Sequence, residues 1–301
     1  GVWNYTYYPN GLLETTTDAK GQTITYYYDE LNRIITKHYP SGPDVVYTYD
    51  ESTSSNPKGR LTKMTDSSGQ TVYDYDPMGR ITGKTVTING TAYPRLSFGY
   101  LNGRLDSITY PDNEIVTYSY NGAGNIWKVG NYVNYTNYDA LGRPLNAAYG
   151  TGGASSLYTY DPVTKRLATL SVLSPTQGML VDNSYGYDDK GNIRSITDNL
   201  DIPLPINVAN ETYTPARAHA IGSTSGRQFQ LDPNGNITGD GLRGFTYNYE
   251  NMPVAVNTTV SSTVLSYDGN GKRVKKSSSG VNTIYIDKYY ECTNGSCSKF
   301  I

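Results

Sequence analysis

The chain has 301 residues, of which 17% are charged, and its formal net charge is −2. This near balance argues against a nucleic-acid-binding surface and against a polybasic membrane patch, because both are strongly basic. The 31 Tyr, 31 Gly and 15 Pro predict many short strands joined by tight turns. No stretch approaches the roughly 18 apolar residues that a membrane helix needs, so we expect no membrane insertion from this segment.

The two ends of the chain have the same composition as its middle. Trp3 and Tyr5 already belong to a tyrosine-rich pattern, and the final residues, Lys299 to Ile301, follow a further hairpin pattern without a cap. We therefore expect the sequence to be a segment of a longer polypeptide. Any targeting signal would then lie outside it.

One sequence motif recurs along the chain. It consists of Tyr-Asp, two variable residues, Gly, then Arg or Asn, and an aliphatic residue, and such repetition predicts a repeat architecture. The clear copies contain Tyr75, Asp76, Gly79 and Arg80; Tyr138, Asp139, Gly142 and Arg143; Tyr187, Asp188 and Gly191; and Tyr267, Asp268 and Gly271. Less regular copies begin at Tyr28, Tyr49, Tyr100, Tyr120, Tyr160, Leu231 and Tyr249.

The motif has the residue types of a hairpin turn. Asp at its first turn position and Gly three residues later favour a type I turn, and Pro77, Pro162 and Pro233 occupy the position after the first in three copies. A Gly in the left-handed region after such a turn gives a bulged hairpin connection. The repeated Asp residues are therefore predicted to be turn residues and not catalytic acids.

The residues on either side of the motif have the pattern of strands. A Tyr-x-Tyr pair precedes most turns, as at Tyr73 and Tyr75, and residues 80–86 form a typical second strand. Residues two apart on a strand share a face, so each hairpin presents a tyrosine pair on one side. We expect neighbouring hairpins to stack these rings, each pair contributing roughly 0.2–1 kcal/mol. The alternative is that the rings stay exposed and stack on sugars.

Two segments depart from the repeat. Residues 198–226 are rich in Pro and Ala without a full copy, which predicts a longer loop or irregular strands, and residues 146–156 contain a flexible turn. Neither segment is long enough for a separate domain. We therefore predict one repeat array over residues 1–301, with an irregular insertion at about 198–226 and a terminal hairpin at 285–301.

The two cysteines, Cys292 and Cys297, flank the dipeptide Asn294-Gly295, the strongest two-residue hairpin signal. With that dipeptide as the loop, the cysteines face each other at a Cα separation of about 4.5 Å, at the short end of disulfide geometry. A structural disulfide would imply an oxidising compartment. The alternatives are a pair of reduced thiols or a metal site, although two scattered histidines complete no set of ligands.

These copies resemble the YD repeat of the RHS (rearrangement hotspot) proteins, which are large bacterial toxin and surface proteins with the teneurins as animal relatives. The resemblance covers nearly the whole chain and is strongest from Ala218 onward, through the copies at Leu231-Asp232-Pro233-Asn234-Gly235 and Tyr267-Asp268-Gly269-Asn270-Gly271. The hairpin at Asn294-Gly295 is similar to the one that leads into the family's core segment. The resemblance implies a β-sheet that spirals into a hollow, barrel-like shell around a C-terminal toxin. The family's self-cleaving aspartyl protease core has no counterpart in this sequence, so no catalytic aspartate is transferred from it.

Other candidate sites have weaker signals. Residues 150–154 are Gly-rich but lack the Lys-Ser/Thr ending and the helix of a phosphate loop. Residues 232–236, with Asp240 beyond them, alternate oxygen ligands as calcium loops do, but they coincide with a repeat turn and lack the terminal Glu. His38 and His219 are each expected to be structural or solvated. We therefore predict no catalytic residue, cofactor or metal.

The predicted fold is all-β, with serial antiparallel hairpins in one curved, spiralling sheet that is part of the shell. The alternative is a β-propeller, in which two hairpins would form one blade. The predicted function is non-enzymatic: a wall segment that encloses a C-terminal toxin or effector cargo of the same longer polypeptide, in a secreted or cell-surface bacterial protein. The alternative is a surface adhesin that binds glycans or a protein partner through aromatic sheet faces.

Overall fold

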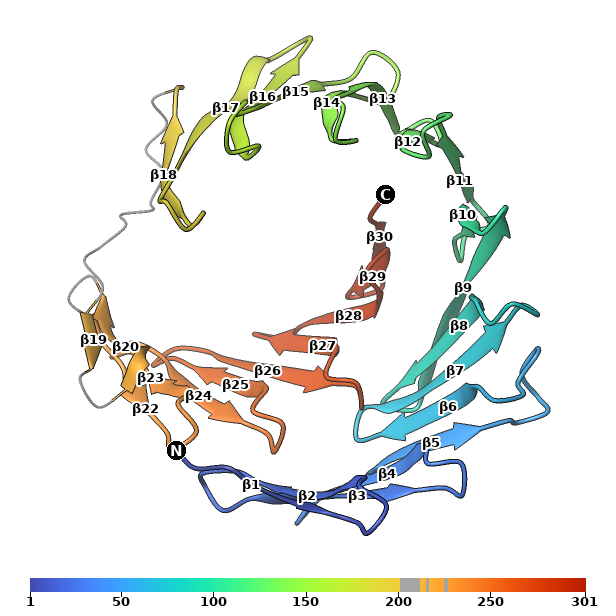
Figure 1. Cartoon of the computed structure of the whole chain (residues 1–301), viewed down its shortest axis with the longest axis vertical. Coiled ribbons are helices and arrows are strands. Elements are labelled where there is room, and N and C mark those ends of the chain that lie inside the picture. The colour runs from blue at the N-terminus through green and yellow to red at the C-terminus, as the bar shows by residue number, and fades with distance from the viewer. Residues whose placement is uncertain (201–211, 215–216, 225–226) are drawn as a thin grey trace. The chain divides into compact units, whose positions relative to one another are not determined.

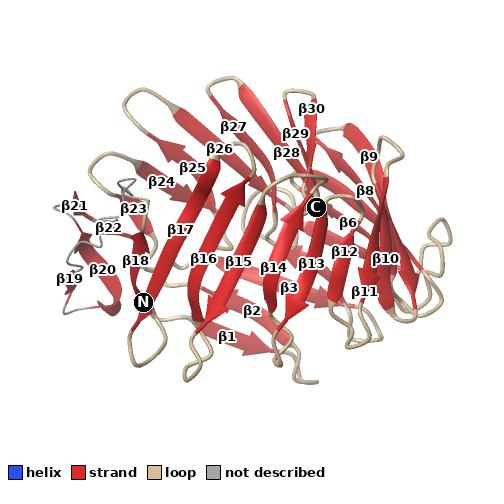
Figure 2. Cartoon of the chain, turned by 90° about the horizontal axis from the view of Figure 1, so that it is seen from above, coloured by secondary structure: helices blue, strands red, loops and turns tan. Residues whose placement is uncertain are grey.

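The computed structural model describes residues 1–200, 212–214, 217–224 and 227–301. In this part of the chain, every helix or strand element is a β-strand (Figure 2). The all-β prediction is therefore confirmed. A search of the same residues for a long, apolar helix that could cross a membrane found none. The chain divides into two compact units, unit 1 with Gly1–Ser97 and Ala209–Phe300, and unit 2 with Phe98–Val208 and Ile301.

The first eighteen strands form one sheet in which each strand hydrogen-bonds to the next along the chain, and Figure 1 shows this order as a colour progression from blue to yellow. The strands of its first half, most of them in unit 1, are β1 (Asn4–Tyr7), β2 (Leu13–Thr17), β3 (Thr23–Tyr28), β4 (Ile34–His38), β5 (Val45–Tyr49), β6 (Leu61–Asp66), β7 (Gly69–Tyr75), β8 (Ile81–Ile88) and β9 (Thr91–Leu101).

The same sheet continues through unit 2, where the pairing is again between consecutive strands. Its strands there are β10 (Arg104–Thr109), β11 (Ile115–Tyr120), β12 (Ile126–Val129), β13 (Val133–Tyr138), β14 (Pro144–Tyr149), β15 (Ser155–Tyr160), β16 (Leu167–Ser174), β17 (Gly178–Tyr187) and β18 (Ile193–Asp198). Serial antiparallel hairpins were predicted and are confirmed. The β-propeller alternative is wrong, because a propeller needs separate four-stranded blades and this sheet has 18 strands.

The C-terminal part of unit 1 contains two smaller sheets, one of three strands and one of nine. Their strands are β19 (Thr212–Thr214), β20 (Arg217–Thr224) and β21 (Arg227–Gln228), and then β22 (Gln230–Leu231), β23 (Ile237–Gly239), β24 (Gly244–Tyr247), β25 (Pro253–Asn257), β26 (Ser262–Tyr267), β27 (Arg273–Ser278), β28 (Val281–Asp287), β29 (Tyr290–Thr293) and β30 (Ser296–Lys299). The expected terminal hairpin at 285–301 is the β29–β30 hairpin, and residues 285–287 belong to β28.

The irregular insertion expected at about 198–226 is only partly described. Strand β18 ends at Asp198, and β19 and β20 lie within the range. The prolines on which the expectation rested, Pro203, Pro205 and Pro215, lie outside the described residues.

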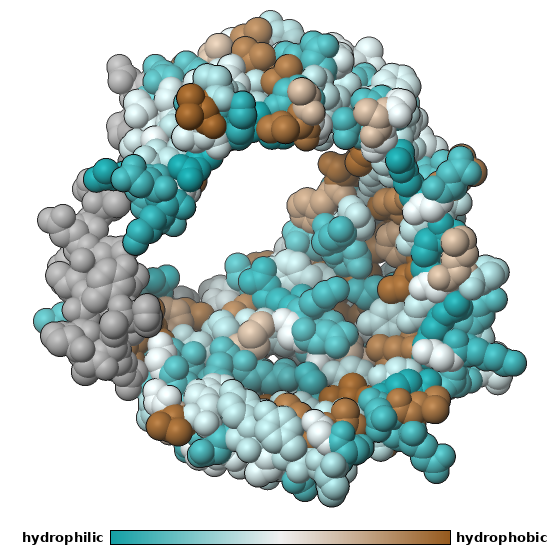
Figure 3. All heavy atoms as spheres, viewed as in Figure 1, coloured by the Kyte–Doolittle hydropathy of each residue, from teal (hydrophilic) through white to brown (hydrophobic). Residues whose placement is uncertain are grey.

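The sheets bury little surface for a chain of this mass. The accessible surface is 17,752 Å², whereas two separate compact units, each with half of this mass, would expose about 15,000 Å² together. Figure 3 shows apolar and hydrophilic residues interspersed over the visible face. In unit 1 the buried cluster centres on Val45, Tyr47 and Met64, and in unit 2 the buried side chains include Ile108 and Val116. Most of the stabilisation must therefore come from contacts between neighbouring hairpins.

Candidate functional site

The repeat turn has the same hydrogen bonds in each clear copy. In the copy at Asp76, the Gly79 N–H donates to the Asp76 carbonyl at 3.0 Å, and the Asp76 N–H donates to the Arg80 carbonyl at 3.0 Å. The Asp76 carboxylate accepts from the Arg80 N–H at 3.0 Å. Gly79 has a φ of +88°, which explains the glycine at this position. The turns at Asp139, Asp188 and Asp268 repeat both backbone bonds, with Gly142, Gly191 and Gly271 as the glycines.

A one-residue register shift lies immediately before each of these turns. It falls between Asp74 and Tyr75 in the pairing of β7 with β8, and at the corresponding tyrosine of β17 and of β26. The extra residue lies on the strand after the turn, as at Thr82, because Asp74 pairs with Gly83 and Tyr75 pairs with Ile81. The bulge therefore lies opposite the motif tyrosine, on the partner strand of the same hairpin.

The hydroxyl of the motif tyrosine binds the preceding repeat. Tyr75 donates from Oη to the Leu61 carbonyl at 2.6 Å, where Leu61 is the first residue after the previous turn. Tyr187 donates in the same way to the Leu167 carbonyl at 2.9 Å. The same bond joins Tyr49 to Ile34, Tyr120 to Leu105, Tyr138 to Ile126, Tyr160 to Pro144, Tyr247 to Ile237 and Tyr267 to Pro253. Each donation fixes one hairpin on its neighbour.

An arginine of the preceding repeat covers the same tyrosine ring. The Arg60 guanidinium carbon lies 5.5 Å from the Tyr75 ring centre, and that of Arg143 lies 3.8 Å from the Tyr160 ring centre. Such a cation–π contact contributes about 0.5–1 kcal/mol at an exposed site. Further pairs are Arg33 with Tyr49, Arg104 with Tyr120, and Arg166 with Tyr187. We call the combination of tyrosine donor, backbone acceptor and covering arginine the repeat clasp.

The repeat clasp differs from the packing expected for the tyrosines. Stacked tyrosine pairs were expected throughout, and such stacking occurs between Tyr39 and Tyr249, whose ring centres are 5.8 Å apart. Two motif tyrosines, Tyr28 and Tyr138, also meet a tyrosine ring, each with ring centres 6.2 Å apart. Tyr75 and Tyr160 meet an arginine and a carbonyl group. The signal whose role sequence reasoning missed is the arginine that follows the turn glycine in several copies, as in Arg60, Arg104 and Arg143.

The same arginines hold the turn carboxylates in their ionised form. The Arg143 side chain donates from Nε to the Asp139 carboxylate at 2.7 Å, and the Arg143 N–H donates at 3.0 Å. These bonds lower the pKa of Asp139 below its ordinary value. In the turn of Asp188, the side-chain amide and N–H of Asn192 have the same effect on its pKa. The aspartates of these exposed turns thus stabilise the turn in their charged form.

The copy at Asp268 is different, because it is docked on the first sheet instead of being exposed. The Gly269 carbonyl accepts from Tyr47 Oη at 2.9 Å and from Lys37 Nζ at 2.9 Å. The Gly269 N–H donates to the Asp66 carboxylate at 2.8 Å. Asp268 itself is only 7% exposed. This turn therefore joins the nine-stranded sheet to strands β4, β5 and β6.

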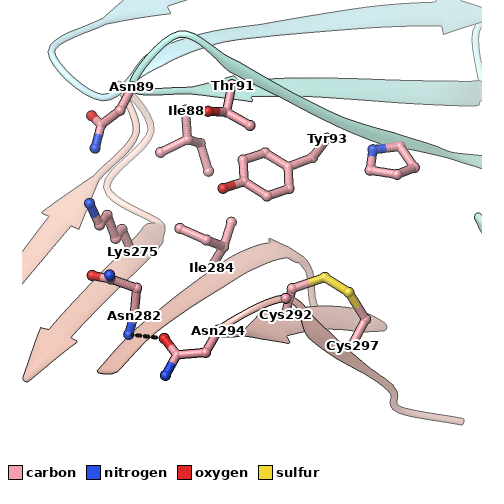
Figure 4. Close-up of a pocket in the computed structure, with 12 residues that line it drawn as sticks. Ile88, Asn89, Thr91, Tyr93, Lys275, Asn282, Ile284, Cys292, Asn294 and Cys297 are labelled. Carbon is pink, nitrogen blue, oxygen red and sulfur yellow. Dashed lines mark hydrogen bonds between the residues drawn. A yellow bond between two sulfur atoms is a disulfide. The ribbon is translucent and has the colours of Figure 1, made fainter. Parts of the chain in front are cut away.

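A groove of about 380 Å³ lies between the β8–β9 hairpin and strands β27 to β30 of unit 1 (Figure 4). Ile88, Tyr93 and Ile284 line it, together with Lys275. Tyr93 and Lys275 are its titratable groups, so the groove contains neither a nucleophile with a base nor a pair of carboxylates. The described lining therefore has no arrangement suited to acid–base or covalent catalysis.

The two cysteines lie at the edge of this groove. Cys292 and Cys297 face each other across the β29–β30 hairpin, and the structure joins their sulfur atoms (Figure 4). Asn294, in the hairpin loop, accepts from the Asn282 N–H at 2.9 Å and so attaches the loop to β28.

The remaining candidate residues have structural contacts. The Asp232 carboxylate accepts from the Asn236 N–H at 2.8 Å and from its side-chain amide at 3.0 Å, and Lys20 lies 3.5 Å away. Among the described residues no cluster of three metal-ligating side chains occurs. His38 binds Asp44 at 2.9 Å on the surface, and the side chain of His219 lies outside the described residues. The Gly150 N–H, in the Gly-rich stretch, already donates to the Tyr132 carbonyl.

Comparison with protein families identifies the repeat. The family model for the RHS repeat matches residues 7–44 and 56–92. These two segments are RHS repeats. The resemblance to the RHS/YD-repeat family is thereby confirmed. A comparison with curated protein sequences gave no match.

Solved structures share the fold of these RHS repeats. The crystal structure of TcdB2-TccC3 matches 97% of this chain with a TM-score of 0.73 and 14% identity. Its TcdB2-TccC3-Cdc42 form matches with a TM-score of 0.71, and the Photorhabdus luminescens Tc holotoxin pore with a TM-score of 0.65, each at 14% identity and 97% coverage. This chain spans 20–21% of the length of the two TcdB2-TccC3 chains. At this identity the likeness establishes the fold.

Proposed function

We propose that this chain is a non-enzymatic wall segment of an RHS-repeat shell that encloses a C-terminal toxin or effector cargo. The observation that supports this most strongly is the repeat clasp, because it uses the recurrent residues of the sequence to fix each hairpin on the next. The same contact recurs in successive hairpins, and this recurrence keeps the sheet continuous. It creates no converging pocket of the kind that a hydrolase needs.

The clasp gives the wall its barrier properties. Backbone hydrogen bonds close each strand on its neighbour, and the tyrosine hydroxyls and arginines add side-chain bonds at the hairpin tips. Proteases need an extended, unpaired backbone, and an 18-stranded sheet offers one only at its edges and in its hairpin loops. A cargo behind such a sheet would be shielded from proteases.

The adhesin alternative has less support. It requires tyrosine rings that are free to stack on glycans, whereas the repeat rings of Tyr75 and Tyr160 are partly buried beneath arginines. We therefore propose that the partner of this segment is the C-terminal part of the same longer polypeptide. We also propose a single repeat array over residues 1–301.

We further propose that the protein is secreted or cell-surface and bacterial. The bonded pair Cys292 and Cys297 supports this location, because disulfides persist in oxidising compartments. Mass measurement after alkylation, with and without a reductant, tests the pairing in the secreted protein.

Limited proteolysis of the complete polypeptide tests enclosure. The sequence that follows residue 301 should survive a protease dose that digests the same sequence expressed alone. Peptide mass spectrometry would identify the protected fragments. Equal digestion of the enclosed and isolated forms would contradict the proposal.

A further inference from the structure

The repeat turn at residues 267–272, here called the latch turn, docks the nine-stranded sheet on the part of the first sheet that belongs to unit 1. Its backbone has three bonds to the first sheet, from Lys37, Tyr47 and Asp66. Gly269 provides both the donor and the acceptor. A Cβ at this position would lie 3.1 Å from Met64 Sδ and 3.2 Å from Val45 Cγ2, so only glycine fits there without displacing its neighbours.

Docking buries a carboxylate whose counterparts in the exposed turns at Asp76 and Asp139 are paired with an arginine. Asp139 is bound by Arg143, whereas the equivalent residue after the latch glycine is Lys272, and only its backbone N–H binds Asp268, at 2.9 Å. The other partner of the Asp268 carboxylate is the Asn270 N–H, at 3.0 Å. The buried carboxylate therefore has backbone donors but lacks the close cationic partner of the exposed turns.

The charged and titratable groups around Asp268 come from every element packed on the latch turn. Asp66 contributes a second negative charge and Lys84 a positive one, but Lys84 already binds Asp287 at 3.3 Å and the Ile286 carbonyl at 2.9 Å. On the first sheet these groups are Lys37 on β4, Tyr39 after it, Tyr47 on β5, Asp66 at the end of β6, Tyr73 on β7 and Lys84 on β8. On the nine-stranded sheet they include Tyr249 and Glu250 after β24, Lys272 in the latch turn, Arg273 on β27, Tyr285 and Asp287 on β28, and Lys288 after it.

We propose that the latch turn is a proton-dependent latch, which holds the nine-stranded sheet on the first sheet while Asp268, Lys37 and Tyr47 are protonated and loosens as they lose protons. The carboxylate of Asp268 is the group that acts between acid and neutral pH. The docked geometry protects it from water and sets it near the Asp66 carboxylate. Deprotonation therefore costs more in the docked state than in a withdrawn turn exposed to solvent.

The pKa shifts of the surrounding groups have the same sign. Burial, followed by the nearby Asp66 charge, raises the pKa of Asp268 above its ordinary value. Burial also raises the pKa of Tyr47, and the Glu250 partner raises the pKa of Lys37 despite its burial. A raised pKa in the docked state means stability that is complete below the ordinary pKa and lost as pH rises through the raised one. Docking should thus weaken first as Asp268 ionises. It should weaken again above about pH 10, as Tyr47 and Lys37 lose their protons.

Hydrogen exchange of the latch turn tests this directly. The Gly269 N–H binds Asp66 only in the docked state, so its exchange, corrected for the pH dependence of the intrinsic rate, measures opening. We expect protection to fall between pH 4 and pH 8, tenfold for each unit by which docking raises the pKa of Asp268. Protection that is constant, or that increases with pH, would overturn the proposal.

Two matched variants separate the latch from general pH effects. Asp268→Asn keeps an oxygen acceptor and removes the charge, so it should hold the latch turn at its low-pH protection throughout the range. Asp139→Asn changes the same motif position in a turn whose carboxylate has a lowered pKa, and it should leave the latch profile unchanged. If Asp268→Asn does not fold, the carbon-13 titration of the wild-type Asp268 carboxyl decides the question: a midpoint at or below the ordinary Asp value of about 3.9 overturns the latch.

Discussion

Gly269→Ala and Gly122→Ala make a matched pair of substitutions at the same position of two repeat turns. Gly269 follows Asp268 in the docked turn, and Gly122 follows Asn121 in an exposed one. Neither glycine has a φ in the left-handed region, so alanine is compatible with both backbones. The two substitutions differ in what the added methyl group would meet.

The expected magnitudes follow from these surroundings. At Gly269 the methyl group would approach Met64 Sδ to 3.1 Å and overlap Val45 Cγ1, whereas ordinary carbon contacts begin near 3.5 Å. Overpacking of this kind costs about 1–3 kcal/mol. Withdrawal of the turn would instead sacrifice three hydrogen bonds, each with a net value of about 1 kcal/mol. At Gly122 nothing lies within 4 Å, and alanine should stabilise by up to about 1 kcal/mol.

Denaturant unfolding of both variants and the wild type measures the difference, which should be about 2 kcal/mol or more between the two alanines. Hydrogen exchange should place the weakened protection of Gly269→Ala in the latch turn and in β5 to β7. If both alanines have equal stability and equal exchange in these segments, the docking role assigned to Gly269 is refuted.

Three further outcomes test the clasp, the turn charges and the terminal hairpin. Tyr75→Phe removes one clasp hydrogen bond and should cost about 1 kcal/mol in urea unfolding, whereas Tyr5→Phe, at a 51% exposed ring, should cost nothing measurable. Asp139→Asn should lower the melting temperature at pH 7 but not at pH 2.5. Since Arg143 lowers the pKa of Asp139, the stability from this carboxylate is present above the ordinary pKa and is lost as pH falls through the lowered one. An equal loss of melting temperature at both pH values would contradict this. Cys297→Ser should destabilise by about 2 kcal/mol, as expected for closure of a short loop, and a reductant should reproduce the loss in the wild type only.

The repeat fold was predictable because its signals are local. Asp76, Gly79 and their counterparts specify a turn from their own backbone preferences, and the tyrosines before them alternate as a strand requires. Serial hairpins pair with their neighbours in sequence, so no long-range information was needed to order the first eighteen strands.

The clasp and the latch turn were not predictable from the same patterns. The Tyr75 hydroxyl reaches a carbonyl 14 residues earlier, and no local residue pattern marks that carbonyl as its acceptor. The latch turn has the sequence of an ordinary repeat, and its difference lies in contacts with residues more than 200 positions away, such as Tyr47 and Asp66. Such contacts depend on how the second sheet returns to the first.

The central proposal is that the chain is a wall segment of a shell, and small-angle X-ray scattering with mass measured in the same run tests it most directly. A compact monomer of this length would have a radius of gyration of about 19 Å. The account predicts a clearly larger value for a monomer, with a profile typical of a curved plate or hollow body. A monomer with a radius near 19 Å would contradict it.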